Sequence, residues 1–392
     1  MRLTALLAPT LAALAFAAAP AARADIHVGV IVSTTGPAAS LGIPEEQTIR
    51  MGPTEIAGQK VRYTILNDAS DTSTAAKSAA RLINEDKVDV IVGASVTPTS
   101  LVVVEAAGAA QVPVISLAGG GAIVLPQDGP RKWAFKLAPT EQLQANRALD
   151  HFQKAGGKTL ATISFANSYG EGFLKAFEPV AEKRGVKIVA SERYNPTDPS
   201  VTAQVLKVMA ANPDGVYVFA SGTQGALPQI ELAQRGYKGP VYQTQGVANN
   251  DFLRVGGKAL EGSFMTVAPA LVPEQLPDSN PIKKVALDYV QRFEAKSGPG
   301  SRSLFGATAW DAMLMVQQAA KEAMAKKTKP GTPEFRAALR DALENLHEFV
   351  GAEGVFNMSA KDHNGVDARS QVLVKIDNGH WKLQPEDAPR SQ

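Results

Sequence analysis

The chain has 392 residues, of which 45% are apolar and 20% are charged, and its 40 basic residues nearly balance its 38 acidic residues. A nearly neutral chain without a basic run has no electrostatic footprint for nucleic acid, which excludes that class of partner. The chain contains no cysteine, which excludes disulfides, thiolate metal sites and a lipid anchor on a cysteine.

The N-terminus has the features of a secretory signal. Arg2 is followed by an uncharged apolar run at 3–19, then by Pro20 and by the small-residue sequence at 22–24. This pattern predicts export with cleavage before Asp25. A retained anchor is the alternative, but the run is shorter than the ~20 residues that span a bilayer. The remaining chain is longer than one hydrophobic core usually organises, so we expect two domains.

Short β-branched runs alternate with helical segments along most of the chain. Strands are expected at 26–33, 61–66, 88–92 and 112–116, with helices such as 72–85 between them. After a helix at 141–155 the rhythm restarts, with strands at 159–165, 187–192, 215–220 and 240–243 and helices at 170–184, 201–211 and 224–235. Strands this apolar are typical of parallel sheets covered on both faces. The pattern therefore predicts two consecutive doubly wound α/β units.

The last part of the chain is more varied. A strand at 263–267 and a Pro-rich linker at 269–281 precede helices at 282–296, 307–326 and 333–346. Asn378-Gly379 lies between two alternating segments, 371–377 and 380–383, and this dipeptide supplies the positive φ angles of a tight hairpin turn. We expect this hairpin to complete the second unit.

The sequence offers no catalytic constellation. The common nucleophile, phosphate-binding and zinc motifs are absent, and the five histidines are scattered without ligand spacing. The loop from Asp68 to Asp71 could hold a hard cation, but Asp71 before Thr72 is more simply a helix cap. We therefore expect a binding protein and not an enzyme, with no cofactor and no metal.

Six corners that follow predicted strands are rich in small and hydroxylated residues, and ligands bind at such corners in doubly wound sheets. The corners are 33–42, 93–100, 116–122, 167–172, 220–225 and 244–249. In the second corner we expect Thr97 to cap a helix with Pro98 at its first position. The free N–H groups and the helix dipole would then stabilise a carboxylate. Together the corners predict a cleft between two units.

Several of these segments resemble one known family. They are Val28–Val32 with Thr35-Gly-Pro37, the Asp68–Asp71 loop, the Gly93 corner, Val112-Pro-Val-Ile-Ser116, Tyr169-Gly-Glu-Gly172 and Gln245-Gly-Val-Ala248. In order and spacing they resemble the class I periplasmic binding proteins, in the leucine/isoleucine/valine-binding branch that serves ABC transporters. The resemblance covers nearly the whole mature chain.

The resemblance implies an α/β fold of two Rossmann-like doubly wound lobes, joined by a hinge of three segments near Pro139, Val267 and Phe349. The lobes are expected at 25–139 with 267–349 and at 140–266 with 350–392. It also implies a monomer in the periplasm that captures a small molecule for an inner-membrane ABC permease and its ATPase subunits.

Resemblance also suggests a ligand class. In amino-acid-binding members, corners matching Thr97 and 118–120 hold the ligand carboxylate, and an acid at the position of Gln245 pairs with the ammonium. An amide cannot neutralise a buried ammonium, so an α-amino acid is a poor candidate. Gly120 stands at a hydroxylated position of the family and Leu41 at an aromatic one, which implies a wider, flatter pocket. A flat monocarboxylate, such as a benzoate or a phenylpropenoate, would fit it.

On this hypothesis three groups of residues bind different parts of the ligand. Thr97, Ser95 and the backbone at 118–121 hold the carboxylate; Leu41, Tyr169 and Phe305 enclose the ring; Gln245, with Ser221 or Thr223, binds a ring substituent. The full set of predicted binding residues is Leu41, Ser95, Val96, Thr97, Ala118, Gly119, Gly120, Tyr169, Ser221, Thr223, Gln245 and Phe305.

Several alternatives stay open at this point. Phe305 could serve only core packing, and the ligand could be an aliphatic amino acid, an amide or a urea. A ligand-sensing receptor module is a candidate of another class.

Overall fold

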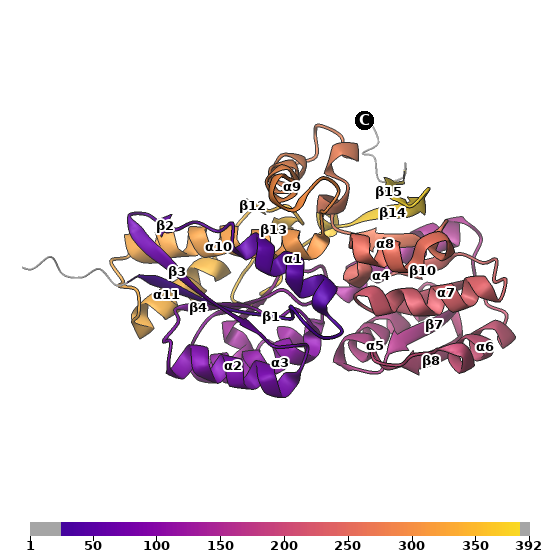
Figure 1. The fold of residues 1–392 in the computed structure, drawn as a ribbon, viewed down its shortest axis with the longest axis horizontal. Helices are drawn as coiled ribbons and strands as arrows, with labels where there is room; N and C mark the ends of the chain where they lie inside the picture. The colour runs from indigo at the N-terminus through magenta and orange to yellow at the C-terminus, as the bar shows by residue number, and fades with distance from the viewer. Residues whose placement is uncertain (1–24, 385–392) are drawn as a thin grey trace, which may run out of the picture.

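Two β-sheets organise the computed structural model, which describes residues 25–384 (Figure 1). The predicted signal segment at 1–24 lies outside the described residues. The first sheet has the order β2-β3-β1-β4-β5-β6, and the second has the order β15-β14-β11-β10-β9-β7-β8. The predicted fold class, two doubly wound α/β units, is confirmed.

The first sheet is parallel apart from its short edge strand β2. Its strands are β1 (Ile26–Val32), β2 (Glu55–Ile56), β3 (Gln59–Asn67), β4 (Val90–Gly93), β5 (Val114–Ser116) and β6 (Ala134–Lys136). Helices cover both faces, because the apolar strands have no polar face to expose. Helices α2 (Thr72–Asn84) and α3 (Thr97–Ala109) share a core with one face, and α10 (Leu304–Ala325) and α11 (Pro333–Glu344) share a core with the other.

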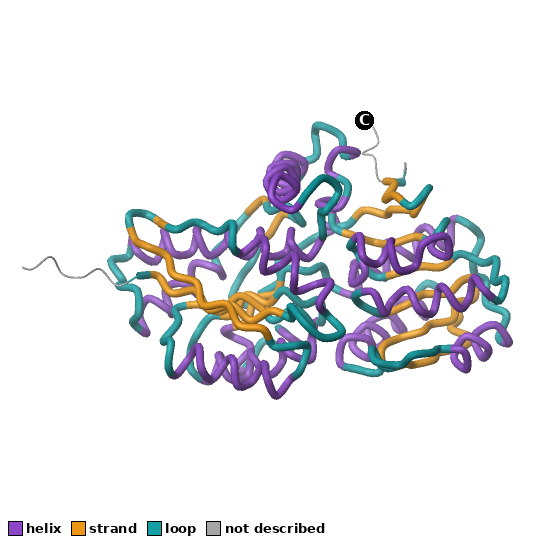
Figure 2. Tube along the Cα trace, viewed as in Figure 1, coloured by secondary structure: helices purple, strands orange, loops and turns teal. Residues whose placement is uncertain are grey.

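The second sheet is parallel from β8 to β11 and antiparallel at its other edge. Figure 2 shows its strands among the surrounding helices. Its strands are β7 (Thr159–Phe165), β8 (Lys187–Tyr194), β9 (Gly215–Phe219), β10 (Val241–Gln243), β11 (Phe264–Val267), β14 (Val372–Asp377) and β15 (His380–Leu383). Its helices are α4 (Glu141–Lys154), α5 (Ser168–Lys183), α6 (Thr202–Ala210), α7 (Ala226–Gln234) and α8 (Asn250–Gly256). In the described residues no helix is both long and apolar enough to cross a bilayer.

The predicted hairpin is confirmed. Asn378 and Gly379 have φ angles of 51° and 73°, and Asp377 pairs with His380 on either side of the turn. The antiparallel β14–β15 pair adds to β11 at the edge of the second sheet, as expected.

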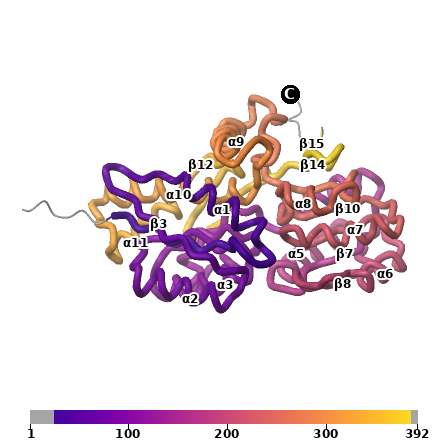
Figure 3. Tube along the Cα trace, in the orientation of Figure 1, coloured from indigo at the N-terminus to yellow at the C-terminus, as the bar shows by residue number. Residues whose placement is uncertain are grey.

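The chain passes between the sheets three times: between β6 and α4, between β11 and α10, and between the short pair β12 (Phe349–Val350) and β13 (Val355–Phe356) and strand β14. Figure 3 shows the late helix α10 against the early helix α1 (Ala39–Ile49), with α11 on the far side of α10. The third passage lies later than the expected position near Phe349, because Phe356 and Met358 pack into the core of the first sheet.

The segment after β11 is packed and is not the open linker that its prolines suggested. It forms two 3₁₀ turns, Pro269–Leu271 and Pro273–Gln275, and its apolar residues are buried. Helix α9 (Lys283–Ser297) packs on these turns and shares a core with β11 and β14. The predicted division into lobes at 25–139 with 267–349 and 140–266 with 350–392 stays a prediction.

Asp311 of α10 fastens the turn between β12 and β13. One carboxyl oxygen accepts the backbone N–H of Ala352 at 2.6 Å, and the other accepts that of Glu353 at 2.9 Å. Burial raises the pKa of Asp311 to about 7, and the two backbone hydrogen bonds oppose this shift. The carboxyl group is therefore held by two backbone hydrogen bonds and not by an opposite charge.

We expect Asp311→Asn to lower the free energy of unfolding by about 1–3 kcal/mol, because an amide has one acceptor oxygen for two buried N–H donors. Urea denaturation at neutral pH measures the loss. The control is Asp288→Asn, which removes an exposed pair with Arg292 on α9 and should cost less than about 0.5 kcal/mol. Equal effects of the two substitutions would contradict this role for Asp311.

Candidate ligand-binding site

A cavity of about 220 Å³ lies between the two units. Its lining comes from corners after β1, β4 and β5 of the first sheet and after β7, β9 and β10 of the second. This position follows from the topology, because parallel strands connected by helices bring all their carboxyl-terminal corners to one edge. The predicted cleft is therefore present, with both units contributing to its walls.

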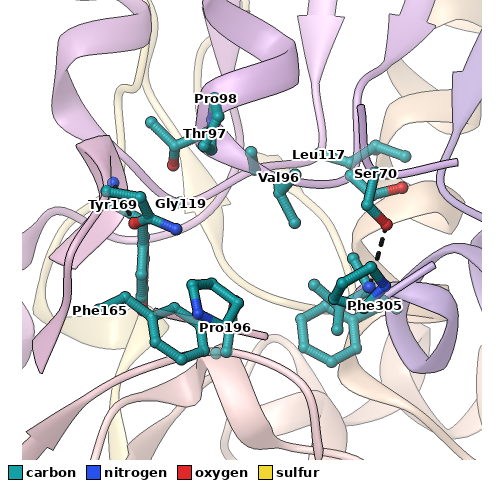
Figure 4. A pocket seen from close by; sticks show the side chains of 18 of the residues that line it. Ser70, Val96, Thr97, Pro98, Leu117, Gly119, Phe165, Tyr169, Pro196 and Phe305 are labelled. Carbon is teal, nitrogen blue, oxygen red and sulfur yellow. Dashed lines mark hydrogen bonds between the residues drawn. The ribbon is translucent and has the colours of Figure 1, made fainter. Parts of the chain in front are cut away.

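The cavity brings together most of the predicted residues. Its lining includes Leu41, Ser95, Val96, Thr97, Ala118, Gly119, Tyr169, Ser221, Gln245 and Phe305. Gly120 and Thr223 do not line it, although Gly120 contacts the lining through Thr97. Figure 4 shows Thr97 and Val96 on one side, Phe165 and Pro196 on the other, and Tyr169 and Phe305 at the two ends. The binding roles of these residues stay predictions.

Thr97 does not cap α3, contrary to our expectation. Val96 is the N-cap residue, Thr97 is the first residue of the helix, and no side chain caps it. The Thr97 hydroxyl instead accepts the backbone N–H of Gly120 at 3.1 Å, which ties the second corner to the third. This bond uses a lone pair of Thr97, so its O–H proton remains available to a ligand.

The glycine corner offers less free backbone than expected. The N–H of Ala118 donates to Ser116 Oγ, that of Gly120 to Thr97, and that of Gly121 to Glu141 Oε1 at 2.7 Å. Among the described residues the N–H of Gly119 makes no hydrogen bond, and Gly119 lines the cavity. The corner can therefore present one N–H group to a ligand, where we expected several.

Aromatic and aliphatic side chains form the walls. The hydroxyl of Tyr169 donates to Thr244 Oγ1 at 2.9 Å, which turns the polar end of this side chain away from solvent. Burial raises the pKa of Tyr169, so the ring stays uncharged. The units also touch here: an added Cβ at Gly119 would lie 3.4 Å from the Tyr169 ring, and one at Gly222 would lie 3.3 Å from Leu41 Cδ1.

None of the described residues that line the cavity has a charged side chain. Four helices begin at it instead, since Leu41, Thr97, Tyr169 and Phe305 belong to the first turns of α1, α3, α5 and α10. The N-terminus of a helix carries partial positive charge and unpaired N–H groups. The helix termini therefore contribute positive potential to an uncharged lining, which favours an anion.

Two carboxyl groups lie directly behind the lining. Ser95 contacts Glu45 Oε2, and Thr308 Oγ1 lies 2.8 Å from Glu353 Oε1. Burial raises the pKa of both acids well above the usual range, and a neighbouring acid adds to the shift at each. Neither acid forms an ion pair within the part of the chain that the structure describes.

Several lining residues were not among those predicted from the sequence. Thr308 lies inside an apolar helix, and Gln144 lies on α4, where its side-chain oxygen is 3.4 Å from the backbone nitrogen of Gln245. The others that we did not predict are Pro37, Ala38, Ser70, Pro98, Leu117, Ala138, Phe165, Asn167, Pro196, Thr197, Gln224, Gly246 and Leu304. Asn167 and Gln224 could have been chosen, because they lie in corners that the sequence analysis identified.

The Asp68–Asp71 loop has the simpler of its two predicted roles. Asp71 Oδ1 accepts the backbone N–H of Thr74 at 2.8 Å and caps α2. Asp68 accepts the Ser33 hydroxyl at 2.6 Å and the Ser70 N–H at 2.9 Å, so it orders the first corner.

Comparison with known proteins identifies a family. A family profile described as "Periplasmic binding protein" matches residues 25–380. The chain is similar to a Leu/Ile/Val-binding protein homologue of Brucella melitensis, with 25% identity over 94% of this chain and 97% of that protein.

Solved structures have the same architecture. An extracellular ligand-binding receptor from Rhodopseudomonas palustris HaA2 is 40% identical, with a TM-score of 0.88 over 92% of this chain and 100% of that one. A solute-binding protein from R. palustris, solved in complex with benzoate, is 20% identical, with a TM-score of 0.76 over 92% of this chain and 95% of that one.

We expect Gly120→Ala to disrupt the link between the second and third corners. The added Cβ would lie 2.5 Å from Thr97 Cγ2 and 2.7 Å from Thr97 Oγ1, so the Thr97 side chain must move and its bond to the Gly120 N–H must break. Denaturation should show a loss of about 1–3 kcal/mol.

The matched control is Gly172→Ala on α5, where an added Cβ meets no atom within 4 Å. It should be neutral or stabilising by up to about 1 kcal/mol, because alanine favours a helix over glycine. A Gly120→Ala protein as stable as the control would contradict the proposed tie.

Proposed function

The chain belongs to the periplasmic binding protein family, and from this premise we propose that its cleft captures a small aromatic carboxylate, similar to benzoate or a phenylpropenoate. The family makes it a solute-binding protein of the ABC-transporter type, and such proteins deliver small ligands to ABC permeases. The proposal includes export, cleavage before Asp25, and delivery to an inner-membrane permease with its ATPase subunits.

The observation that carries the proposal is the uncharged lining on which four helix N-termini converge. A carboxylate there would receive the Gly119 N–H and the Thr97 hydroxyl without a buried counter-ion. Hydrogen bonds to an ionised acceptor are about twice as strong as neutral ones, so a few suffice to hold it.

The same lining disfavours an α-amino acid. Gln245 lines the cavity at the position where the family resemblance implies an acid. None of the described lining residues is an aspartate or a glutamate. A buried ammonium without an ionised partner costs several kcal/mol. The fold itself does not decide between ligand classes, because one relative is a Leu/Ile/Val-binding protein homologue and another was solved with benzoate. The side chains of this cleft must decide.

A ring fits the remaining walls. Tyr169 and Phe305 lie at opposite ends of the cavity, with Phe165 and Pro196 along one side (Figure 4). Flat apolar surfaces of this kind favour a planar ligand over a branched aliphatic one. The Gln245 side-chain oxygen is buried and makes no hydrogen bond among the described residues, so it could accept a proton from a ring hydroxyl.

The first experiment is a ligand panel on protein that has been unfolded and refolded to remove co-purified solutes. Benzoate, 4-hydroxybenzoate and cinnamate should raise the melting temperature, since a ligand that binds only the folded state stabilises it. Leucine, isoleucine, acetamide and urea should not. A shift with leucine and none with the aromatic acids would contradict the proposed ligand class.

We also expect Gln245→Glu to weaken binding of the aromatic carboxylate by about tenfold or more, because a second negative charge would enter the cleft. Isothermal titration calorimetry measures the change. Gln142→Glu is the matched control, since Gln142 lies on the exposed surface of α4 and its substitution adds the same charge away from the cavity. Equal affinity in the two variants would remove Gln245 from the site.

A further inference from the structure

Ser95 and Glu45 form a hydrogen-bonded pair, and the number of protons that they share decides what Ser95 can offer a ligand. Ser95 lines the cavity, and Glu45 lies behind it on α1 with no exposed surface. Ser95 Oγ accepts the backbone N–H of Ser33 at 2.9 Å and also contacts Glu45 Oε2. A hydroxyl has one proton and two acceptor positions, so the state of Glu45 fixes where that proton points.

If Glu45 were ionised, Ser95 would have to give its proton to the carboxylate. The cavity would then face only a lone pair of Ser95, with a buried negative charge behind it. Such an arrangement repels an anion. It is also costly, because the described residues offer Glu45 no cation, and its second oxygen, Oε1, has no hydrogen-bond partner there.

If Glu45 is a neutral acid, the hydrogen bonds are consistent. Its own O–H donates to Ser95 Oγ, the Ser33 N–H fills the other acceptor position, and the Ser95 proton is free to point into the cavity. The unpartnered Oε1 is then an uncharged carbonyl oxygen. We propose that Glu45 is held as a neutral carboxylic acid and thereby makes Ser95 a hydrogen-bond donor to the ligand carboxylate.

The surroundings of Glu45 support this state. The acidic groups that face it are Asp68, at the corner after β3, and Glu353, between β12 and β13. The buried cation Lys136 acts on Glu353. Burial, with Asp68 as the second contribution, raises the pKa of Glu45 well above its usual range, while the Ser95 hydrogen bond opposes the shift. Ser33, Asp68 and Ser95 all belong to the first sheet and its corners, so the arrangement does not depend on the second unit.

The same comparison of protons with acceptors applies to Thr308, on another wall of the cavity. Thr308 Oγ1 lies 3.1 Å from the carbonyl oxygen of Leu304 and 2.8 Å from Glu353 Oε1. Its single proton can serve one of these acceptors, so the other contact is a hydrogen bond only if Glu353 supplies a proton. Two hydroxyls of the lining are thus backed by acids without ion pairs.

This inference rests on the proposed function, because it names how the cleft selects an anion. It adds Glu45 as a positioning residue that acts through Ser95. The same arrangement would disfavour a ligand ammonium, because a Ser95 hydroxyl that donates into the cavity cannot also accept from that side.

Infrared difference spectroscopy of the ligand-free protein tests the state of Glu45 directly. The spectrum of the wild type minus that of Glu45→Gln should contain the carbonyl stretch of a protonated carboxyl group at about pH 7. Bands of an ionised carboxylate in this difference would overturn the proposal. Glu46→Gln is the matched control, since Glu46 is partly exposed and paired with Arg50, and its difference spectrum should show an ionised carboxylate.

Ligand binding tests the role of Ser95. Ser95→Ala should weaken benzoate binding by about tenfold or more, the loss expected for a hydrogen bond to a charged group, and should weaken benzamide binding less. An equal loss for both ligands, or no loss for either, would overturn the proposed donor role. If the wild type binds none of the aromatic acids of the panel, the proposed function fails, while the infrared spectrum still decides the protonation of Glu45.

Discussion

The architecture depends on one constraint, which is that both sheets are largely parallel and present their carboxyl-terminal corners to the same cleft. Each following helix begins there with N–H groups that have no intrahelical partner. These groups need acceptors, and the structure provides some of them: Asn167 caps α5, Asp71 caps α2, and Glu141 receives the Gly121 N–H. The Gly119 N–H has no acceptor among the described residues, so it remains available to a ligand, as does the Thr97 hydroxyl.

Ionised acidic residues near such a cleft would disfavour an anion, since their negative charge would cancel the positive potential of the helix N-termini. The structure places Glu45 and Glu353 behind hydroxyls, in full burial and without ion pairs. Burial without a counter-ion favours the neutral form of an acid. A neutral acid keeps its hydrogen-bonding capacity, so the lining stays polar at Ser95 and Thr308. Because it adds no negative charge, it does not cancel the positive potential of the helix N-termini.

The sequence predicted features that depend on neighbouring residues. The Asn378-Gly379 turn is local, as is the cap at Asp71, and both are as expected. The corner containing Thr97 was located, but its hydroxyl bonds across to Gly120, a contact that no local pattern reveals. Glu45 and Thr308 were missed because they lie within helices, and only the three-dimensional packing of α1 and α10 brings them to the cleft. The third passage was misplaced for a similar reason, since Phe356 packs with residues of the first sheet that are distant from it in the sequence.

The passages between the sheets connect the two units and also contribute to the cleft. Asn364 donates to the carbonyl oxygens of Lys136 and Ala138, which ties the third passage to the first, and the buried Lys136 ammonium donates to the carbonyl oxygen of Ala138 at 2.5 Å. Ala138 also lines the cavity. Across the cleft, Gly119 faces Tyr169 and Gly222 faces Leu41, and three of these four residues, Gly119, Tyr169 and Leu41, line the cavity. A ligand that contacts both sides therefore stabilises the arrangement in which the units meet, because its contacts exist in full only there.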